Sequence, residues 1–198
     1  MLKRYGKIGV LKLIISFIYT KIVHNKARLI RLPFDLRNKR NIDLGNKLTT
    51  GVGCRIEAHP IKLNKKKVLL LGDNIEINDY VHIAAGESVV IGNNVLIASK
   101  VFISDINHGS YSGQYQDDPL SIPNKRKLST SPVLIEDNVW IGESVCVLPG
   151  VTIGKGAIIG SLSVVTKNIP AYSIAVGAPA KVIKEYNFEI KEWVAKKK

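Results

Sequence analysis

The segment "IEDNVWIGESVCVLPGVTIGKGAIIGSLSVV", residues 135–165, contains the most regular pattern of this chain. An aliphatic residue returns at every sixth position without a gap, at Ile135, Ile141, Val147, Ile153, Ile159 and Val165. Glycine directly follows three of them, at Gly142, Gly154 and Gly160. A strict period of six is neither the period of a helix nor plain strand alternation. It is typical of a solenoid in which short strands join through tight turns.

The same period organises the middle of the chain. A second series comprises Leu71, Ile77, Ile83, Ile91, Ile97 and Ile103, with a two-residue slip between Ile83 and Ile91. We therefore predict a mainly β fold, a parallel β-helix with three units per turn, in which residues eighteen apart, such as Ile141 and Ile159, lie one above another. The glycines are expected at corners that need positive φ. A β-sandwich, with turns about every 8 to 12 residues, does not produce six consecutive hits.

Composition bounds the remaining possibilities. The chain has 198 residues, of which 45% are hydrophobic and 23% are charged, as expected for one main ordered domain. We predict a β-helix domain over residues 45–184, preceded by a basic segment over 1–44 and followed by a helix over 185–198. The two cysteines, Cys54 and Cys146, have no disulfide-framework or zinc-site spacing. Reduced cysteines and a cytoplasmic location follow from this.

The first forty residues carry most of the net charge of +13, with eleven lysines and arginines against one acid, Asp35. Their longest apolar run, Leu13 to Tyr19, is far short of the ~20 residues that span a bilayer. No small-residue cleavage pattern follows it, so we expect the segment to stay in the mature chain. We predict an amphipathic helix, which either packs on its own coil or lies peripherally on an anionic membrane, at the inner face of the cytoplasmic membrane.

The other end of the coil also needs a cap, because a solenoid otherwise exposes its apolar last turn. Tyr186, Ile190, Trp193 and Val194 recur at helical spacing. This pattern predicts the C-terminal helix.

A polar excursion interrupts the coil over residues 104–134, between Ile103 and Ile135. It begins "SDINHGSYSGQYQDD" and contains His108. Loops of this length in compact domains are usually functional or disordered. A neutral imidazole, with a reference pKa of about 6.5, can take a proton from a hydroxyl group at physiological pH. His108 is therefore a candidate general base that Asp105 could orient, although a lone loop histidine is more often plain surface.

Three stretches together resemble a known family. Residues 138–184, "NVWIGESVCVLPGVTIGKGAIIGSLSVVTKNIPAYSIAVGAPAKVIK", resemble the signature region of the hexapeptide-repeat acyltransferases, which include maltose and galactoside acetyltransferases. Residues 77–109 extend the resemblance. The combination of "TTGVGCRIEAH" at 49–59 with "NHGSYSG" at 107–113 is similar to the branch that O-acetylates bacterial cell-surface polysaccharides such as O-antigen and capsule.

The resemblance implies a homotrimer of left-handed β-helices, with active sites between neighbouring subunits and acetyl-CoA as cosubstrate. It implies that His108 is the general base, and that a sugar hydroxyl attacks the thioester directly, without an acyl-enzyme. Backbone N–H groups would stabilise the oxyanion. The acceptor would be a saccharide, free or lipid-linked.

The family motif also implies cofactor-binding residues on positions of this sequence. They are Trp140, Ser161, Thr166, Lys167, Lys181 and Lys184, with the last two near the 3'-phosphate of the coenzyme. Leu162 departs from the pattern, because relatives often carry a small or polar residue there.

On the acceptor side the resemblance points to Asn78, Tyr80 and His82. His59 raises the comparison with zinc enzymes built on the same coil. The spacing of His59, His82 and His108 lacks their close histidine pair, so we expect no metal site.

Two other functions stay open at this point. One is an N-acetyltransferase of an amino sugar nucleotide, which would use the same groove, and the other is a non-catalytic scaffold. Charge alone raises nucleic-acid binding, but no nucleic-acid motif supports it, and we expect no nucleic-acid partner.

Overall fold

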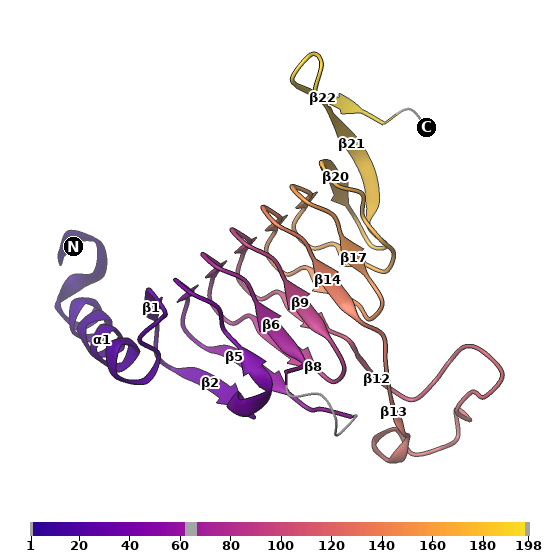
Figure 1. Ribbon diagram of the computed structural model, residues 1–198, viewed down its shortest axis with the longest axis horizontal. Helices are drawn as coiled ribbons and strands as arrows, with labels where there is room; N and C mark the ends of the chain where they lie inside the picture. Colours follow the sequence, from indigo (N-terminus) through magenta and orange to yellow (C-terminus); the bar gives the residue numbers. More distant parts are fainter. Residues whose placement is uncertain (1, 62–66, 197–198) are drawn as a thin grey trace.

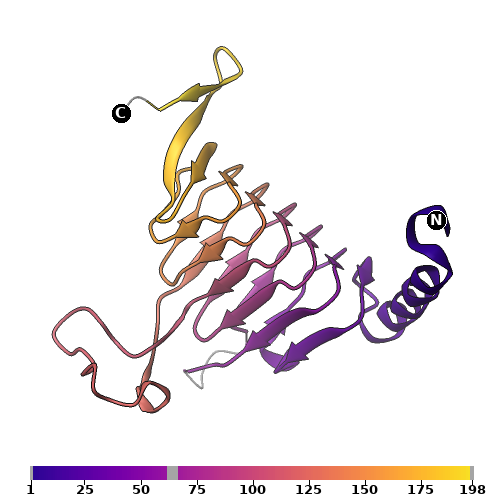
Figure 2. The ribbon, with the colours of Figure 1, turned by 180° about the vertical axis from the view of Figure 1, so that it is seen from behind.

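The computed structural model describes residues 2–61 and 67–196, which form a three-sided coil of short parallel strands (Figure 1). Each sheet takes one strand from each turn, so neighbours in a sheet are far apart in the sequence. Figure 2 shows from behind how the turns stack along one axis, with one long ribbon projecting from the coil. The predicted parallel β-helix is confirmed.

Three parallel sheets make up the sides of the coil. The first sheet contains β1 (Leu29–Ile30), β4 (Thr49–Thr50), β7 (Glu76–Ile77), β10 (Leu96–Ile97), β15 (Trp140–Ile141), β18 (Ile158–Ile159) and β20 (Ser173–Val176). The second contains β2 (Phe34–Arg37), β5 (Cys54–Ala58), β8 (His82–Ala85), β11 (Phe102–Ser104), β16 (Cys146–Val147) and β19 (Val164–Val165). The third contains β3 (Ile42–Asp43), β6 (Leu69–Leu71), β9 (Val89–Ile91), β14 (Val133–Ile135) and β17 (Thr152–Ile153).

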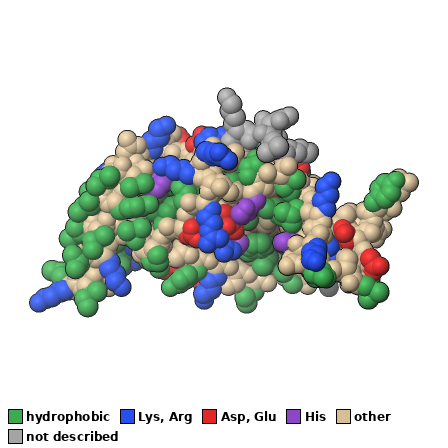
Figure 3. Space-filling model, turned by 90° about the horizontal axis from the view of Figure 1, so that it is seen from below, with side chains coloured by type: hydrophobic (Ala, Val, Ile, Leu, Met, Phe, Trp, Pro, Cys, Tyr) green, Lys and Arg blue, Asp and Glu red, His purple; other side chains and the backbone are tan. Residues whose placement is uncertain are grey.

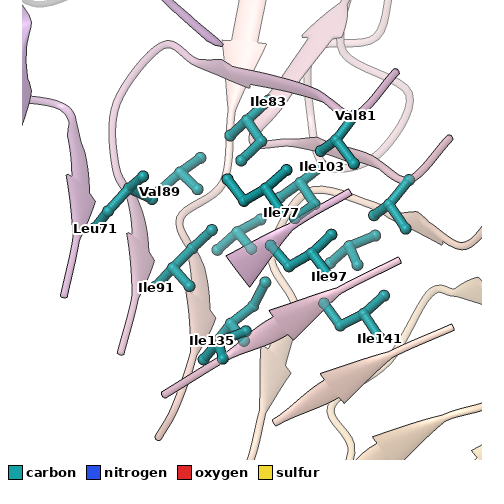
Figure 4. Packing of buried hydrophobic residues seen from close by; sticks show 14 of the residues in the cluster. Leu71, Ile77, Val81, Ile83, Val89, Ile91, Ile97, Ile103, Ile135 and Ile141 are labelled. Atoms are coloured by element: carbon teal, nitrogen blue, oxygen red, sulfur yellow. The ribbon is translucent and has the colours of Figure 1, made fainter. Parts of the chain in front are cut away.

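The core is a set of aliphatic ladders that run along the coil axis. Ile97 pairs with Ile77 on one side and Ile141 on the other, and Ile141 pairs with Ile159 eighteen residues later. All four side chains are buried, and Figure 4 shows such residues converging from the three sheets. Apolar burial of this kind stabilises a fold by roughly 25 cal/mol per Å². The aliphatic residue that recurs at every sixth position is therefore a buried core residue of each strand.

The corners differ from the prediction in which residues take positive φ. Asn74, Asn94 and Asn138 have φ values of 60°, 55° and 60°. Gly142 follows a repeat aliphatic but is not in this region. A Cβ built on Gly142 would lie 2.6 Å from the backbone nitrogen of Ser161 on the next turn. Such glycines are needed for close approach of successive turns, and asparagine tolerates the left-handed corners.

The coil begins earlier than the predicted boundary at residue 45. Strands β1 to β3, over residues 29–43, pair in the three sheets and form a first turn, with a short 3₁₀ helix η1 (Lys39–Asn41) between β2 and β3. The predicted 1–44 segment therefore contains one helix and one turn of coil. Its high charge concealed that Ile30, Leu36 and Ile42 already follow the six-residue period.

The predicted N-terminal helix forms as α1 (Leu2–Val23), with a break at Gly6 where φ is 64°. Its fully buried side chains, Ser16 and Thr20, are polar, and the partly buried Tyr19 packs against the core. The Thr20 hydroxyl accepts a hydrogen bond from the Ile30 N–H at 2.8 Å, and the Ser16 hydroxyl accepts one from the Leu32 N–H at 3.1 Å. The outward side mixes exposed lysines with large apolar side chains, which are Ile8, Leu11, Ile14, Ile15, Phe17, Ile18 and Ile22.

The predicted C-terminal helix over 185–198 is wrong for its described residues, and residues 197–198 lie outside them. The chain instead forms an antiparallel hairpin of β21 (Lys181–Asn187) and β22 (Glu192–Ala195), which extends the first sheet beyond β20. The Asn187 side chain accepts hydrogen bonds from the N–H groups of Glu189 and Ile190 and so makes the turn. Tyr186 pairs with Trp193 across the strands. Aromatic pairs of this kind favour strands over a helix.

Candidate active site

The ribbon that interrupts the coil carries His108 at its base. It consists of β12 (Ile106–His108) and β13 (Leu128–Thr130), which pair antiparallel so that His108 lies opposite Leu128. Figures 1 and 2 show this segment projecting away from the coil. Within residues 2–61 and 67–196 the His108 ring is exposed and makes no hydrogen bond or ion pair. Both ring nitrogens are therefore accessible within the described part of one chain.

Asp105 does not orient that ring, and the role predicted for it is wrong. Its side chain is fully buried at the root of the ribbon. One carboxylate oxygen accepts the Gly86 N–H at 2.6 Å, and the other accepts the N–H groups of Glu87 at 2.8 Å and Ser88 at 2.6 Å. Asp105 therefore closes the turn between β8 and β9, where three backbone donors would otherwise be unpaired.

A groove of about 510 Å³ lies on the outer side of the second sheet. Two of the three predicted acceptor residues, Tyr80 and His82, line this groove. Asn78 is exposed one corner earlier and is not part of its lining. The other groove side chains include Phe34 and Arg55, on β2 and β5. Aromatic rings beside polar and charged groups are typical of small-molecule sites.

The His82 ring is held at both nitrogens. Its Nε2 lies 2.7 Å from a Glu57 carboxylate oxygen, and the Arg55 guanidinium lies 3.1 Å from its Nδ1. Guanidinium groups only donate hydrogen bonds, so Nδ1 accepts, and Nε2 carries the proton and donates to Glu57. The Phe102 ring packs 5.2 Å away. With both ring nitrogens hydrogen-bonded, the imidazole is fixed in place and shapes the groove.

Glu57 is the centre of a charged cluster that the sequence analysis missed. Arg37 lies 3.2 Å from its carboxylate, and Arg55 and His59 each lie 3.4 Å away. Burial raises the pKa of the Glu57 carboxyl, but the His82 hydrogen bond and the Arg55 charge outweigh burial and set the pKa below its usual value. Figure 3 shows acidic, basic and histidine side chains gathered on one face. Alternation within "CRIEA" could have placed Arg55 and Glu57 on the outer face, but not beside His82.

Two of the predicted coenzyme residues lie in one row on the first sheet. Trp140 is half exposed and pairs with Ile158. Ile158 pairs with Ile174, and Ile174 pairs with Lys184 on β21. Lys181 lies at the start of the same strand. The row joins an aromatic surface to a cationic end, an arrangement suited to an extended ligand that ends in phosphate.

The other predicted coenzyme residues lie at corners. Ser161 and Leu162 form the corner between the first and second sheets, and Leu162 is exposed with a φ of 62°. Thr166 and Lys167 follow β19 and are exposed after the second sheet. One chain therefore does not bring all six side chains to one surface.

This architecture defines a class of protein, the hexapeptide-repeat β-helices, and the comparisons identify the family. The family model described as "Bacterial transferase hexapeptide (six repeats)" matches residues 132–167. The chain is 45% identical over 195 residues to "Putative lipopolysaccharide biosynthesis O-acetyl transferase WbbJ" of Escherichia coli K12, covering 96% of this chain and 95% of that protein. It is 34% identical over 148 residues to the galactoside O-acetyltransferase of the same organism, covering 75% and 68% respectively.

A solved structure supports the same fold. A variant of AntD, an N-acyltransferase from Bacillus cereus in complex with dTDP-4-amino-4,6-dideoxyglucose and coenzyme A, matches with a TM-score of 0.67 at 24% identity, over 83% of each chain. This chain belongs to the hexapeptide-repeat acetyltransferases, and its coil is the left-handed parallel β-helix of that family.

Among residues 2–61 and 67–196 no group of three or more His, Cys, Asp or Glu side chains could hold a metal ion. No helix that the structure describes is long and apolar enough to cross a membrane.

Proposed function

We propose that this chain transfers acetyl from acetyl-CoA to a hydroxyl group of a cell-surface polysaccharide or of its lipid-linked precursor. The observation that carries the proposal is the exposed imidazole of His108 on a ribbon that leaves the coil. Identity along nearly the whole length of a relative named as a lipopolysaccharide biosynthesis O-acetyl transferase supports the acceptor class.

The reaction needs one base and no covalent intermediate on the protein. His108 takes the proton of the sugar hydroxyl while that oxygen attacks the thioester carbonyl carbon. Backbone N–H groups stabilise the tetrahedral oxyanion. The C–S bond then breaks, and the departing sulfur of coenzyme A takes the proton from the imidazolium. Acetyl ester and free thiol are the products, and the base is regenerated.

The coenzyme lies along the first sheet in this proposal. Trp140 contacts the pantetheine arm, the Ser161 backbone meets it at the corner, and Lys184 with Lys181 binds the 3'-phosphate. Lysine gives a point-charge contact there and not the two-pronged contact of arginine. Thr166 and Lys167 lie at another corner and would complete the site from a neighbouring subunit.

The acceptor occupies the groove lined by Tyr80 and His82 in the same scheme, with Asn78 beside it. His108 makes no contact with this groove inside the described part of one chain, and its ribbon points away from the coil. A homotrimer resolves this separation, because the ribbon of one subunit can reach the groove of the next.

Release of free thiol from acetyl-CoA tests the activity directly. We expect thiol release only when a bacterial surface glycan with free hydroxyl groups is present, and an acetyl ester that mild alkali removes from the product. Turnover with an amino sugar nucleotide, together with no turnover on any glycan, would contradict the proposal and assign N-acetyl transfer. Absence of turnover with every acceptor, from protein that binds acetyl-CoA, would contradict it as well.

Helix α1 supports a cytoplasmic enzyme bound peripherally to an anionic membrane. Its polar side packs on the coil, so its isoleucines and Phe17 face outward, together with Lys12 and Lys21. Such a helix can bury its apolar side in the headgroup region while each lysine near the anionic surface adds about 1 kcal/mol. Both cysteines are free thiols, consistent with a reducing compartment.

Sedimentation with vesicles tests this contact. We expect binding to vesicles containing phosphatidylglycerol, weaker binding in high salt, and at least about a tenfold loss of binding on replacing Ile15, Ile18 and Ile22 with serine. Ile183→Ser is the matched control, because Ile183 is also exposed but lies on β21. Unchanged vesicle binding of the triple variant would contradict the proposal. A drop in its mass in solution without lipid would assign this face to a contact between subunits.

A further inference from the structure

We propose that Arg126 and Tyr111 are positioning residues that fix the backbone of His108 and thereby aim its ring. The inference rests on the proposed role of His108 as general base. It concerns the segment between β12 and β13, which contains only the short 3₁₀ helix η2 (Pro123–Lys125) and is otherwise irregular.

Arg126 is the centre of this segment. Its Nε donates to the Ser121 hydroxyl at 2.9 Å, and its Nη2 donates to the carbonyl oxygens of Ser121 at 2.8 Å and Pro119 at 3.2 Å. Its Nη1 donates to the Tyr111 hydroxyl at 2.9 Å, and the guanidinium lies 5.9 Å from the centre of that ring. One planar cation therefore ties both halves of the segment together.

Tyr111 passes this constraint on to His108. Its hydroxyl accepts the hydrogen bond from Arg126 and donates its own proton to the His108 carbonyl oxygen. The ring of Tyr111 is 57% exposed, so burial does not hold it in place. The two hydrogen bonds at its hydroxyl set its position.

The residue after the histidine is built into the same network. Gly109 has a φ of +107°, and a Cβ there would lie 2.9 Å from the Tyr111 hydroxyl oxygen and 3.1 Å from Cδ of Arg126. Its N–H donates to the Lys127 carbonyl oxygen at 3.1 Å, and its own carbonyl oxygen accepts the Ser129 hydroxyl at 2.5 Å. The N–H group and the carbonyl oxygen of Gly109, directly after His108, are thus both hydrogen-bonded.

This network substitutes for a partner on the ring itself. Many catalytic histidines are oriented by a carboxylate on the second nitrogen, but Asp105 is committed to the turn at residues 86–88. With no bond to the His108 ring inside the described part of one chain, its direction follows from the backbone and the rotamer. Small errors in placing a base are costly, because a misplacement of about 1 Å can lower a rate by about 10².

Tyr111→Phe tests the proposal, because it removes one oxygen atom and keeps the ring. We expect kcat to fall about tenfold, with KM for acetyl-CoA and for the acceptor changed by less than about twofold. Tyr115→Phe is the matched control, since Tyr115 is 82% exposed in the same segment and should leave kcat unchanged. Equal kcat for Tyr111→Phe and wild type would overturn the inference.

A double-mutant cycle with His108→Ala separates positioning from general structure. If Tyr111 acts through His108, Tyr111→Phe has no further effect on the residual rate of His108→Ala. An additive tenfold loss in that background would overturn the inference while leaving the general base in place. Full activity of His108→Ala would instead overturn the proposed function, so the two failures are distinguishable.

Discussion

Replacing His108 with alanine is expected to lower kcat for acetyl transfer by about 10²- to 10⁴-fold, the usual contribution of a general base. The fold should be unaffected, because the ring is exposed and makes no hydrogen bond in the described part of one chain. KM for acetyl-CoA should change little, since the coenzyme is proposed to lie along Trp140 and Lys184 on the first sheet.

The measurement is thiol release at saturating acetyl-CoA and acceptor, made on protein whose mass in solution and melting temperature match the wild type. Tyr115→Phe again provides the comparison, because Tyr115 is 82% exposed in the same segment and takes part in none of the proposed contacts. A kcat for His108→Ala within twofold of the wild type would remove this residue from the mechanism.

The largest loss of stability is expected at Asp105. Asp105→Ala leaves the buried N–H group of Gly86 and the partly buried N–H groups of Glu87 and Ser88 without their acceptor. An unpaired buried donor costs about 1 to 3 kcal/mol, and the two partly buried donors cost less than that maximum because water can reach them, so the free energy of unfolding should fall by about 3 to 5 kcal/mol. The ribbon should lose its fixed root at the same time.

Urea unfolding checks this expectation. Asp105→Asn keeps one carbonyl acceptor and should lose clearly less than Asp105→Ala. Asp73→Ala is the surface control, because the Asp73 carboxylate also accepts a backbone N–H, from Asn46 at 2.9 Å, but is exposed. That variant should lose much less stability than Asp105→Ala, because water can replace the lost acceptor at an exposed site. If Asp105→Ala lowered the free energy of unfolding no more than Asp73→Ala, the role assigned to Asp105 in the turn would be contradicted.

The fold was predictable because each buried position recurs locally in the sequence. The spacing of Ile141 and Ile159 predicted their stacking, since three units of six residues make one turn. The ends were not predictable in the same way. The spacing of Tyr186, Ile190 and Trp193 fits a helix, but the side chain of Asn187 bonds to the backbone and turns the chain into a hairpin.

The candidate site was predictable only residue by residue. His108 could be singled out because it stands in a polar excursion from a regular coil. The partners of its neighbours could not, because they come from distant positions: Asp105 bonds to residues 86–88, and Arg126 reaches Tyr111 across fifteen residues. Spacing shows which face of the coil a residue occupies, whereas contacts between turns depend on how those turns are stacked.

The ribbon leaves the coil at a point where its length can change without a change in the coil. Coil pairing continues almost unbroken across the excursion, since Ser104 pairs with Ala84 before it and Val133 pairs with Val89 after it. Lengthening a loop between fixed ends costs only about 0.6 kcal/mol for each doubling of its length. Insertions and deletions beyond β12 can therefore accumulate without loosening the ladders. The length of the ribbon can vary in this way while the coil, which carries the proposed coenzyme and acceptor contacts, keeps its packing.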